Sequence, residues 1–164
     1  MRAALLLAGA LAGCCCLSAR EASLEVREVA RSGYCNTPGD APRVQLLAGA
    51  QAVMDWQRAR GTALAAAEQL APATYAVVEH GARSTGGYGI TVTRGEVRGE
   101  LAVLQVTFVA PAPGAMTTQA LSAPCVLVQL PPGSYAGVEV RDAAGALRAT
   151  GNFTSPPAAP EPSR

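Results

Sequence analysis

Apolar and polar residues alternate in several short runs of this chain, and that alternation predicts β-strands. The clearest run is 101–109, in which Ala102, Leu104, Val106 and Phe108 fall on one face, because successive side chains of a strand point to opposite faces. The run 74–79 is mostly apolar, which indicates a strand in the interior of a sheet. The other expected strands cover residues 24–31, 43–47, 88–94, 125–130, 135–141 and 147–150.

Helical spacing replaces the alternation between the strands expected over residues 43–47 and 74–79. Val53, Trp56 and Ala59 recur at helical intervals within residues 51–60, which predicts a short amphipathic helix. Trp56 is the only tryptophan, and we expect it to pack this helix onto a sheet. A second short helix is expected over residues 63–70.

The expected strands are close in sequence and joined by turn residues, which favours antiparallel pairing over crossover connections. The fold class that follows is mostly β (α+β). We expect an antiparallel sheet, arranged as a sandwich or a partly open barrel, with one or two short helices before the main meander. A single domain would cover residues 24–150. Residues 151–164 contain four prolines and are expected to form a disordered tail.

The first residues have the organisation of a bacterial export signal. Arg2 precedes an apolar stretch, 3–12, that is too short to span a bilayer, for which about 20 residues are needed. The following Leu-Ala-Gly-Cys, residues 11–14, has the form of a lipobox, where cleavage leaves Cys14 as the lipidated N-terminus. The alternative is ordinary cleavage a few residues later, but this would place the bulky Leu17 where a small residue is preferred.

A lipobox predicts a lipoprotein with a signal peptide over 1–13 and a tether over 14–23. Each buried CH₂ of an acyl chain such as palmitate contributes about 0.8 kcal/mol, so two or three chains give a stable membrane anchor. Cys15, rather than aspartate, follows Cys14. By analogy with sorting in enteric bacteria, this favours the outer membrane, with the protein facing the periplasm.

The amino-acid composition indicates which side chains form the core and bears on one class of partner. Hydrophobic residues make up 49% of the chain but aromatic residues only 4%, so the core must consist mainly of aliphatic side chains. All 13 basic residues are arginine, the formal charge is +1, and no basic block is present. Because nucleic-acid-binding proteins concentrate positive charge on one face, the sequence argues against a nucleic-acid partner.

Cys35 and Cys125 are the cysteines of the expected folded part. In an oxidising compartment two such cysteines can pair. A bridge between them would close a long loop and stabilise the fold by about 4–5 kcal/mol in the chain-entropy picture. The alternative is two unpaired thiols, with Cys125 buried in a strand, and the sequence leaves both open.

Candidate catalytic chemistry is sparse. His80 is the only histidine, and a catalytic triad would require a nucleophile and an orienting acid beside it. Ser84 lies close in sequence but outside any Gly-x-Ser-x-Gly elbow. A zinc site needs three or four ligands, and no recognisable set accompanies His80. The sequence therefore predicts no catalytic residues, no metal site and no cofactor.

The stretch Gly81–Tyr88, which reads Gly-Ala-Arg-Ser-Thr-Gly-Gly-Tyr, joins two expected strands. Its glycines indicate backbone with positive φ or a close approach to other atoms. Arg83, Thr85 and Tyr88 are the side chains that can grip a carboxylate or an extended peptide. In the alternative, purely structural interpretation, Gly86 and its neighbour form a bulge or tight turn and Tyr88 packs inward.

This stretch also carries a resemblance to a known family. The apolar strand, the glycine, Arg83 and the Thr-Gly-Gly-Tyr sequence, followed by an alternating strand, resemble the C-terminal domain of the PrcB family. The similarity continues through the strand at 101–106 and past Pro124, so that it covers residues 75–141. Cys125 departs from the expected pattern, which has an aromatic residue there.

The resemblance implies a PrcB-like domain and a function without catalysis. PrcB-like proteins are bacterial lipoproteins, named for a subunit of a surface protease complex. We therefore expect a lipid-anchored envelope protein that acts as an interaction or accessory subunit, with a protease as one candidate partner. The alternative is a module that binds a small ligand or peptide through residues 81–88, which includes protease inhibition.

Overall fold

The computed structural model describes residues 22–153. The expected signal peptide, the lipidation site Cys14 and nearly all of the expected tether lie outside this range, as do residues 154–164. The elements, in chain order, are β1 (Ala22–Leu24), β2 (Arg27–Ser32), β3 (Arg43–Ala48), α1 (Gly49–Arg60), a 3₁₀ turn η1 (Ala67–Gln69), β4 (Thr74–Glu79), β5 (Gly89–Arg98), β6 (Leu101–Val109), β7 (Cys125–Leu130), β8 (Gly137–Arg141) and β9 (Leu147–Gly151).

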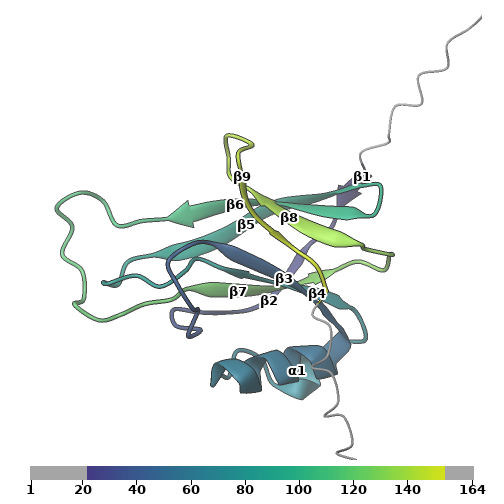
Figure 1. The fold of residues 1–164 in the computed structure, drawn as a ribbon, viewed down its shortest axis with the longest axis horizontal. Coiled ribbons are helices and arrows are strands. Elements are labelled where there is room, and N and C mark those ends of the chain that lie inside the picture. The colour runs from purple at the N-terminus through teal and green to yellow at the C-terminus, as the bar shows by residue number, and fades with distance from the viewer. Residues whose placement is uncertain (1–21, 154–164) are drawn as a thin grey trace, which may run out of the picture.

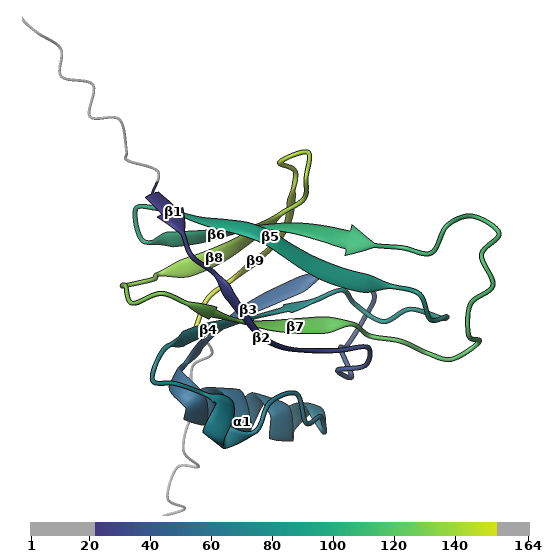
Figure 2. The same ribbon diagram turned by 180° about the vertical axis from the view of Figure 1, so that it is seen from behind.

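Two β-sheets stack face to face, and α1 covers the outer face of one of them (Figures 1 and 2). The five-stranded sheet has the order β1-β5-β6-β8-β9, and the four-stranded sheet has the order β2-β7-β4-β3. The prediction of a mostly β, antiparallel-rich fold is thus confirmed in its sandwich form, with one helix and one 3₁₀ turn before β4. Among the described helices, none is both long and apolar enough to cross a bilayer.

One strand pair departs from the antiparallel meander that the sequence predicted. Strands β6 and β8 are neighbours in the five-stranded sheet and run parallel. The chain leaves β6, crosses to the other sheet to form β7, and then returns as β8. Because the chain reverses direction into β7 and again into β8, β8 runs in the same direction as β6.

Apolar side chains form two separate layers. The larger lies between the sheets, and the smaller lies between the four-stranded sheet and α1. In β4, Ala76 and Val78 belong to the first layer, whereas Tyr75 and Val77 belong to the second. This confirms the interior position predicted for β4 and explains why its sequence is apolar on both faces. Ala102, Leu104 and Val106, which the sequence placed on one face of β6, are fully buried between the sheets.

Helix α1 packs through Val53 and Trp56, which are buried against the four-stranded sheet, as the sequence predicted for Trp56. The helix ends at Gly61, which adopts the left-handed conformation with φ of 62°. Glycine enters this region without the steric cost of a Cβ atom, and helices commonly end this way.

The second helix expected over residues 63–70 is absent from the structure. Buried Gln57 instead turns its side-chain amide toward this segment. Its Oε1 accepts hydrogen bonds from the backbone N–H groups of Leu64 and Ala65, and its Nε2 donates to the carbonyl of Ala65 at 3.0 Å. These backbone groups are therefore satisfied without helical bonds, and only the turn η1 forms.

The strand expected over residues 24–31 is two strands in different sheets. β1 pairs with β5, and β2 pairs with β7. Residues 25–26 carry the chain from one sheet to the other, and Val26 packs on the layer between the sheets. The alternation continues through Val26 and ends only at the polar pair Arg27 and Glu28, so the sequence pattern gives no signal at the break itself.

Strand β5 also continues beyond residue 94, where the sequence predicted its end, as far as Arg98. Gly95, Glu96 and Val97 pair with Leu104, Val103 and Ala102 of β6. A Cβ atom at Gly95 would collide with side-chain atoms of Val26 and Leu24. This glycine therefore marks a close approach within the sheet, where the sequence suggested a turn.

The C-terminal boundary of the domain lies beyond the expected residue 150. Gly151 ends β9, the carbonyl of Asn152 accepts a hydrogen bond from the N–H of Leu46 at 3.1 Å, and Phe153 forms a bridge with Leu46. The assignment of residues 151–153 to a disordered tail is therefore wrong. The end of β9 instead covers part of the outer edge of β3.

We predict that Gly151→Ala destabilises the protein by about 1–3 kcal/mol, the usual cost of overpacking. A Cβ atom at Gly151 would meet the backbone carbonyl of Val44, which cannot move aside as a flexible side chain can. Chemical denaturation followed by circular dichroism measures the change. Gly33→Ala is the matched control, because no atom lies within 4 Å of its added Cβ. Equal unfolding free energies for the two variants would contradict the prediction.

Candidate functional site

The stretch Gly81–Tyr88 connects β4 in the four-stranded sheet to β5 in the five-stranded sheet. It therefore crosses between the two layers at one end of the sandwich. Gly81 has φ of 90° and Gly87 has φ of 87°. A Cβ atom at Gly81 would also collide with the carbonyl of Asp40. At both positions glycine meets a backbone requirement, as the sequence indicated.

The stretch is paired with the connection between β6 and β7. Arg83 and Ser122 exchange two backbone hydrogen bonds, with N···O distances of 2.7 and 2.9 Å. The N–H of Gly86 donates to the carbonyl of Thr118 at 2.9 Å, and the hydroxyl of Ser122 donates to the carbonyl of Thr85 at 2.7 Å. These bonds fix the backbone of residues 83–86 and make the two connections one unit.

His80 stands at the base of this unit and is almost fully buried. Arg83 donates to the ring nitrogen Nδ1 of His80 through Nε at 3.0 Å and approaches it with Nη2 at 2.8 Å. Nη2 also donates to the carbonyl of His80 at 2.9 Å. Burial, and then the positive charges of Arg83 and Arg148, lower the pKa of His80. The ring is therefore neutral near pH 7, with Nδ1 as the acceptor and the proton on Nε2.

Aromatic rings enclose His80 on two sides. Tyr88 and Phe108 both meet its ring edge to face, with ring centroids 5.5 and 5.1 Å away. The guanidinium carbon of Arg83 lies 5.6 Å from the centre of the Tyr88 ring, which is the range of cation–π attraction.

The three side chains singled out from the sequence thus have different surroundings. Arg83 and Tyr88 are half-buried and meet in the cluster around His80, whereas Thr85 takes part through its backbone carbonyl. Because Arg83 directs two of its three guanidinium nitrogens to His80, most of its hydrogen-bonding capacity is used within the fold. The arrangement serves first to hold the two connections together.

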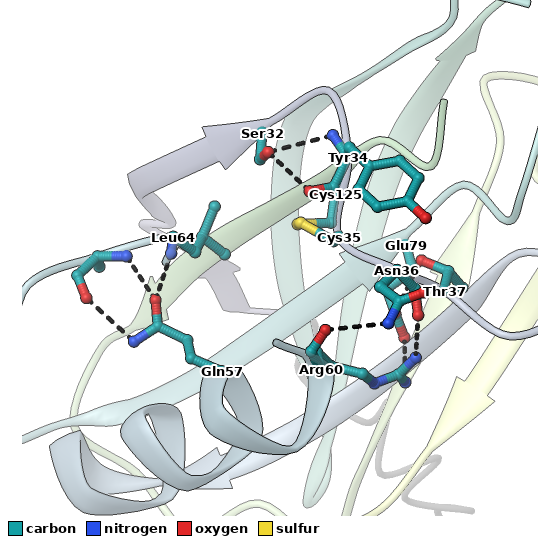
Figure 3. Close-up of a disulfide and its surroundings, with 11 residues drawn as sticks. Ser32, Tyr34, Cys35, Asn36, Thr37, Gln57, Arg60, Leu64, Glu79 and Cys125 are labelled. Atoms are coloured by element: carbon teal, nitrogen blue, oxygen red, sulfur yellow. Dashed lines mark hydrogen bonds and ion pairs between the residues drawn. A yellow bond between two sulfur atoms is a disulfide. The ribbon is translucent and has the colours of Figure 1, made fainter. Parts of the chain in front are cut away.

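The two cysteines of the folded part form a disulfide (Figure 3). Cys35 follows β2, Cys125 begins β7, and their Cα atoms lie 6.0 Å apart across a sequence separation of 90 residues. Both belong to the apolar layer beneath α1. The bond therefore joins the loop that follows an edge strand, β2, to an interior strand, β7.

A buried ion pair lies beside the disulfide (Figure 3). Glu79, at the end of β4, is only 1% exposed, and its carboxylate is 3.2 Å from Nη2 of Arg60. The hydroxyl of Thr37 donates to the same carboxylate at 2.9 Å. Asn36 and Arg60 also bond each other, since each side chain donates to the backbone carbonyl of the other residue. A buried carboxylate is costly without such partners.

Sequence reasoning missed this network because its members come from a loop, a helix end and a strand end that are far apart in the chain. The one available signal was Glu79, a charged residue that closes an apolar run.

The described residues include no group of three or more His, Cys, Asp or Glu side chains that could hold a metal ion. A serine–histidine triad requires a carboxylate at the histidine nitrogen that faces away from the nucleophile. Here Nδ1 of His80 faces the guanidinium of Arg83 instead. The surroundings of His80 therefore differ from those of a triad histidine.

Comparison with known protein families gives a match to part of the chain. Residues 74–131 match the family described as PrcB C-terminal, which confirms the resemblance noted in the sequence for that part of the chain. The matched region runs from the start of β4 to just past β7, so it contains His80, the stretch 81–88 and the connection paired with it. Neither the curated proteins nor the solved structures include a significant match to this chain.

We predict that the protein loses stability as the pH falls from about 7.5 to about 5.5, because burial holds the pKa of His80 below its unfolded value of about 6.5. Below pH 6.5 the unfolded chain binds a proton more readily than the folded one, so the stability present above that pH is lost. Denaturant titrations across this range measure the effect.

His80→Gln is the control for this prediction. Glutamine keeps an acceptor for Arg83 but does not titrate, and the chain has no other histidine. The variant should show a flat profile over the same range. An equal pH dependence in both proteins would rule out His80 as its source.

We predict that replacing both members of the disulfide, as Cys35→Ala with Cys125→Ala, lowers the unfolding free energy by about 4–5 kcal/mol, the loop-closure value for this separation. Reducing agent should destabilise the native protein and leave the double variant unchanged. Denaturation with and without reductant measures both effects. A native protein that is insensitive to reductant, although its thiols become reactive, would contradict the prediction.

Proposed function

We propose that the protein is a lipid-anchored accessory subunit of the bacterial envelope and that it binds a protein partner without catalysis. Its residues 74–131 match the PrcB C-terminal family. The family match carries this proposal, because the family is associated with a subunit of a protease complex. A protease is accordingly the first partner to test.

The N-terminal sequence supports an anchor in the membrane. The lipobox at residues 11–14 would leave Cys14 as the acylated N-terminus, and the described domain begins soon after it, at Ala22. A disulfide inside the domain suits an oxidising compartment. We place the protein at the outer membrane, facing the periplasm.

The shape of the domain supports binding at the end remote from this anchor. In both views β1, which follows the tether, lies at one end of the sandwich, and the connection between β6 and β7 extends from the opposite end (Figures 1 and 2). This connection exposes Met116 and Leu121, and Tyr34 is exposed beside it through its bridge to Ala123. Exposed large apolar side chains that gather on one surface are typical of protein interaction sites.

The alternative function, ligand or peptide binding by residues 81–88, has less support. Arg83, the side chain best suited to grip a carboxylate, already donates to His80. We therefore assign the partner surface to the apolar side chains of residues 116–121, with the stretch 81–88 as their support.

Crosslinking in intact cells, followed by purification of the full-length protein from membranes, tests the proposal. We expect repeated recovery of one protein partner. Met116→Asp with Leu121→Asp should reduce its recovery at least tenfold, because charged side chains oppose burial in an apolar interface. Leu147→Asp is the matched control, since Leu147 is also exposed but belongs to β9, and recovery should be unchanged.

The anchor is tested in the same cells with Cys14→Ser. This variant should leave the membrane fraction and lose incorporation of labelled palmitate. Repeated purifications that recover no partner would overturn the accessory role, and a membrane-bound, acylated Cys14→Ser protein would overturn the anchor.

A further inference from the structure

A hollow of about 360 Å³ opens at the edge where β3 meets the end of β9. This is the size of small ligand sites in proteins. It lies at the C-terminal end of α1, outside the unit around His80, and only Glu79 among its lining residues falls within the family match. Its walls are mainly polar, formed by Arg43, Gln45, Arg60, Glu79, Thr150 and Asn152.

Positive charge predominates in this hollow. Glu79 is its acidic residue, and that carboxylate is already paired with Arg60 and bonded by Thr37. Arg43 is exposed, and its guanidinium has neither a hydrogen bond nor an ion pair with any residue in the range 22–153. With two guanidinium groups and one carboxylate, the hollow keeps an excess of one positive charge, which leaves the site complementary to an anion.

Arg60 is held in place before any ligand arrives. Its Nη2 contacts Glu79 at 3.2 Å, its Nη1 donates to the carbonyl of Asn36 at 3.2 Å, and its own carbonyl accepts from Asn36 at 3.1 Å. Its side chain is still 18% exposed. A guanidinium fixed in this way loses little conformational entropy on binding.

The backbone of β3 also supplies a hydrogen-bond donor to the hollow. β3 is an edge strand, and the N–H of Leu46 points outward to the carbonyl of Asn152. Because N–H groups two residues apart in an antiparallel strand point to the same side, the N–H of Val44 also points outward, into the hollow that it lines. The carbonyl of Val44 on the same side of the strand is covered by Gly151, so this N–H is the open part of the edge, and open strand edges pair with extended peptides.

We propose that this hollow binds the C-terminal carboxylate of an extended peptide segment from another polypeptide. Arg43 and Arg60 take the carboxylate oxygens, and the N–H of Val44 donates to a carbonyl of the peptide backbone. Because Gly151 covers the carbonyl of Val44 and Asn152 accepts from the N–H of Leu46, the segment pairs with β3 only at the N–H of Val44. This inference is independent of the proposed accessory role, since the partner surface of residues 116–121 is at another site.

The test uses the ¹⁵N-labelled full-length protein in detergent and nuclear magnetic resonance. The probe is an equimolar mixture of acetylated pentapeptides with randomised side chains and a free C-terminal carboxylate. We expect saturable shifts of the amide signals of Val44, Gln45 and Thr150. The same mixture with amidated C-termini should need at least tenfold higher concentration, because the ionic bonds to the carboxylate are lost.

Matched variants test whether the positive charge of Arg43 binds the carboxylate. Arg43→Gln should weaken binding about tenfold, and Arg43→Lys should retain most of it. Arg58→Gln is the control, because Arg58 lies on the same helix as Arg60 and pairs with Asp55 outside the hollow. Equal binding of the carboxylate and amide mixtures, or an unaltered affinity of Arg43→Gln, would overturn the proposal.

Two further measurements identify what occupies the hollow. Inorganic phosphate that causes the same shifts at the same concentration would show a general anion site and exclude a peptide site. A variant that ends at Phe153 should have unchanged Val44 and Gln45 signals without peptide. If those signals move, the chain's own residues 154–164 occupy the hollow, and the proposal of another polypeptide fails.

Discussion

The fold depends on burial of the four-stranded sheet on both faces. Strands β4 and β7 present apolar side chains to the opposite sheet and, on the other side, to α1. A sheet with two apolar faces needs two covers, so the helix is required as much as the second sheet. The disulfide belongs to the smaller layer, and the pair Arg60–Glu79 lies beside it (Figure 3).

The end of β4 shows how this constraint positions polar chemistry. Glu79 and His80 are consecutive, and side chains of consecutive strand residues point to opposite faces. Glu79 meets Arg60 on the helix side, whereas His80 meets Tyr88 and Phe108 toward the other sheet. One strand end therefore supplies a buried ion pair to one layer and a neutral, ring-enclosed histidine to the other.

The sequence predicted those features that rest on local periodicity. The bounds of β4, β6 and β7 and the packing of Trp56 follow from apolar spacing. The break between β1 and β2 could not be predicted, because residues 25–26 keep the alternation while the chain changes sheets. The missing second helix depends on Gln57, whose amide competes for backbone groups only once α1 is docked. The hollow beside β3 joins Arg43, Arg60 and Glu79 from three separate elements, and no spacing in the chain indicates that they meet.

The disulfide changes the way in which tension would pass through the molecule. A pull between the N-terminal side of Cys35 and Met116 would act on residues 35 to 116, a contour of 116 − 35 = 81 residues, if the thiols were free. With Cys35 bonded to Cys125, the shorter covalent route returns from Cys125 to Met116 over 125 − 116 = 9 residues. At about 3.3–3.6 Å per extended residue, the bond limits the extension of this segment to about 30 Å where about 270–290 Å would otherwise be possible. Whatever its N-terminal side and this connection are attached to, the segment between them is thus a short link that extends little under tension.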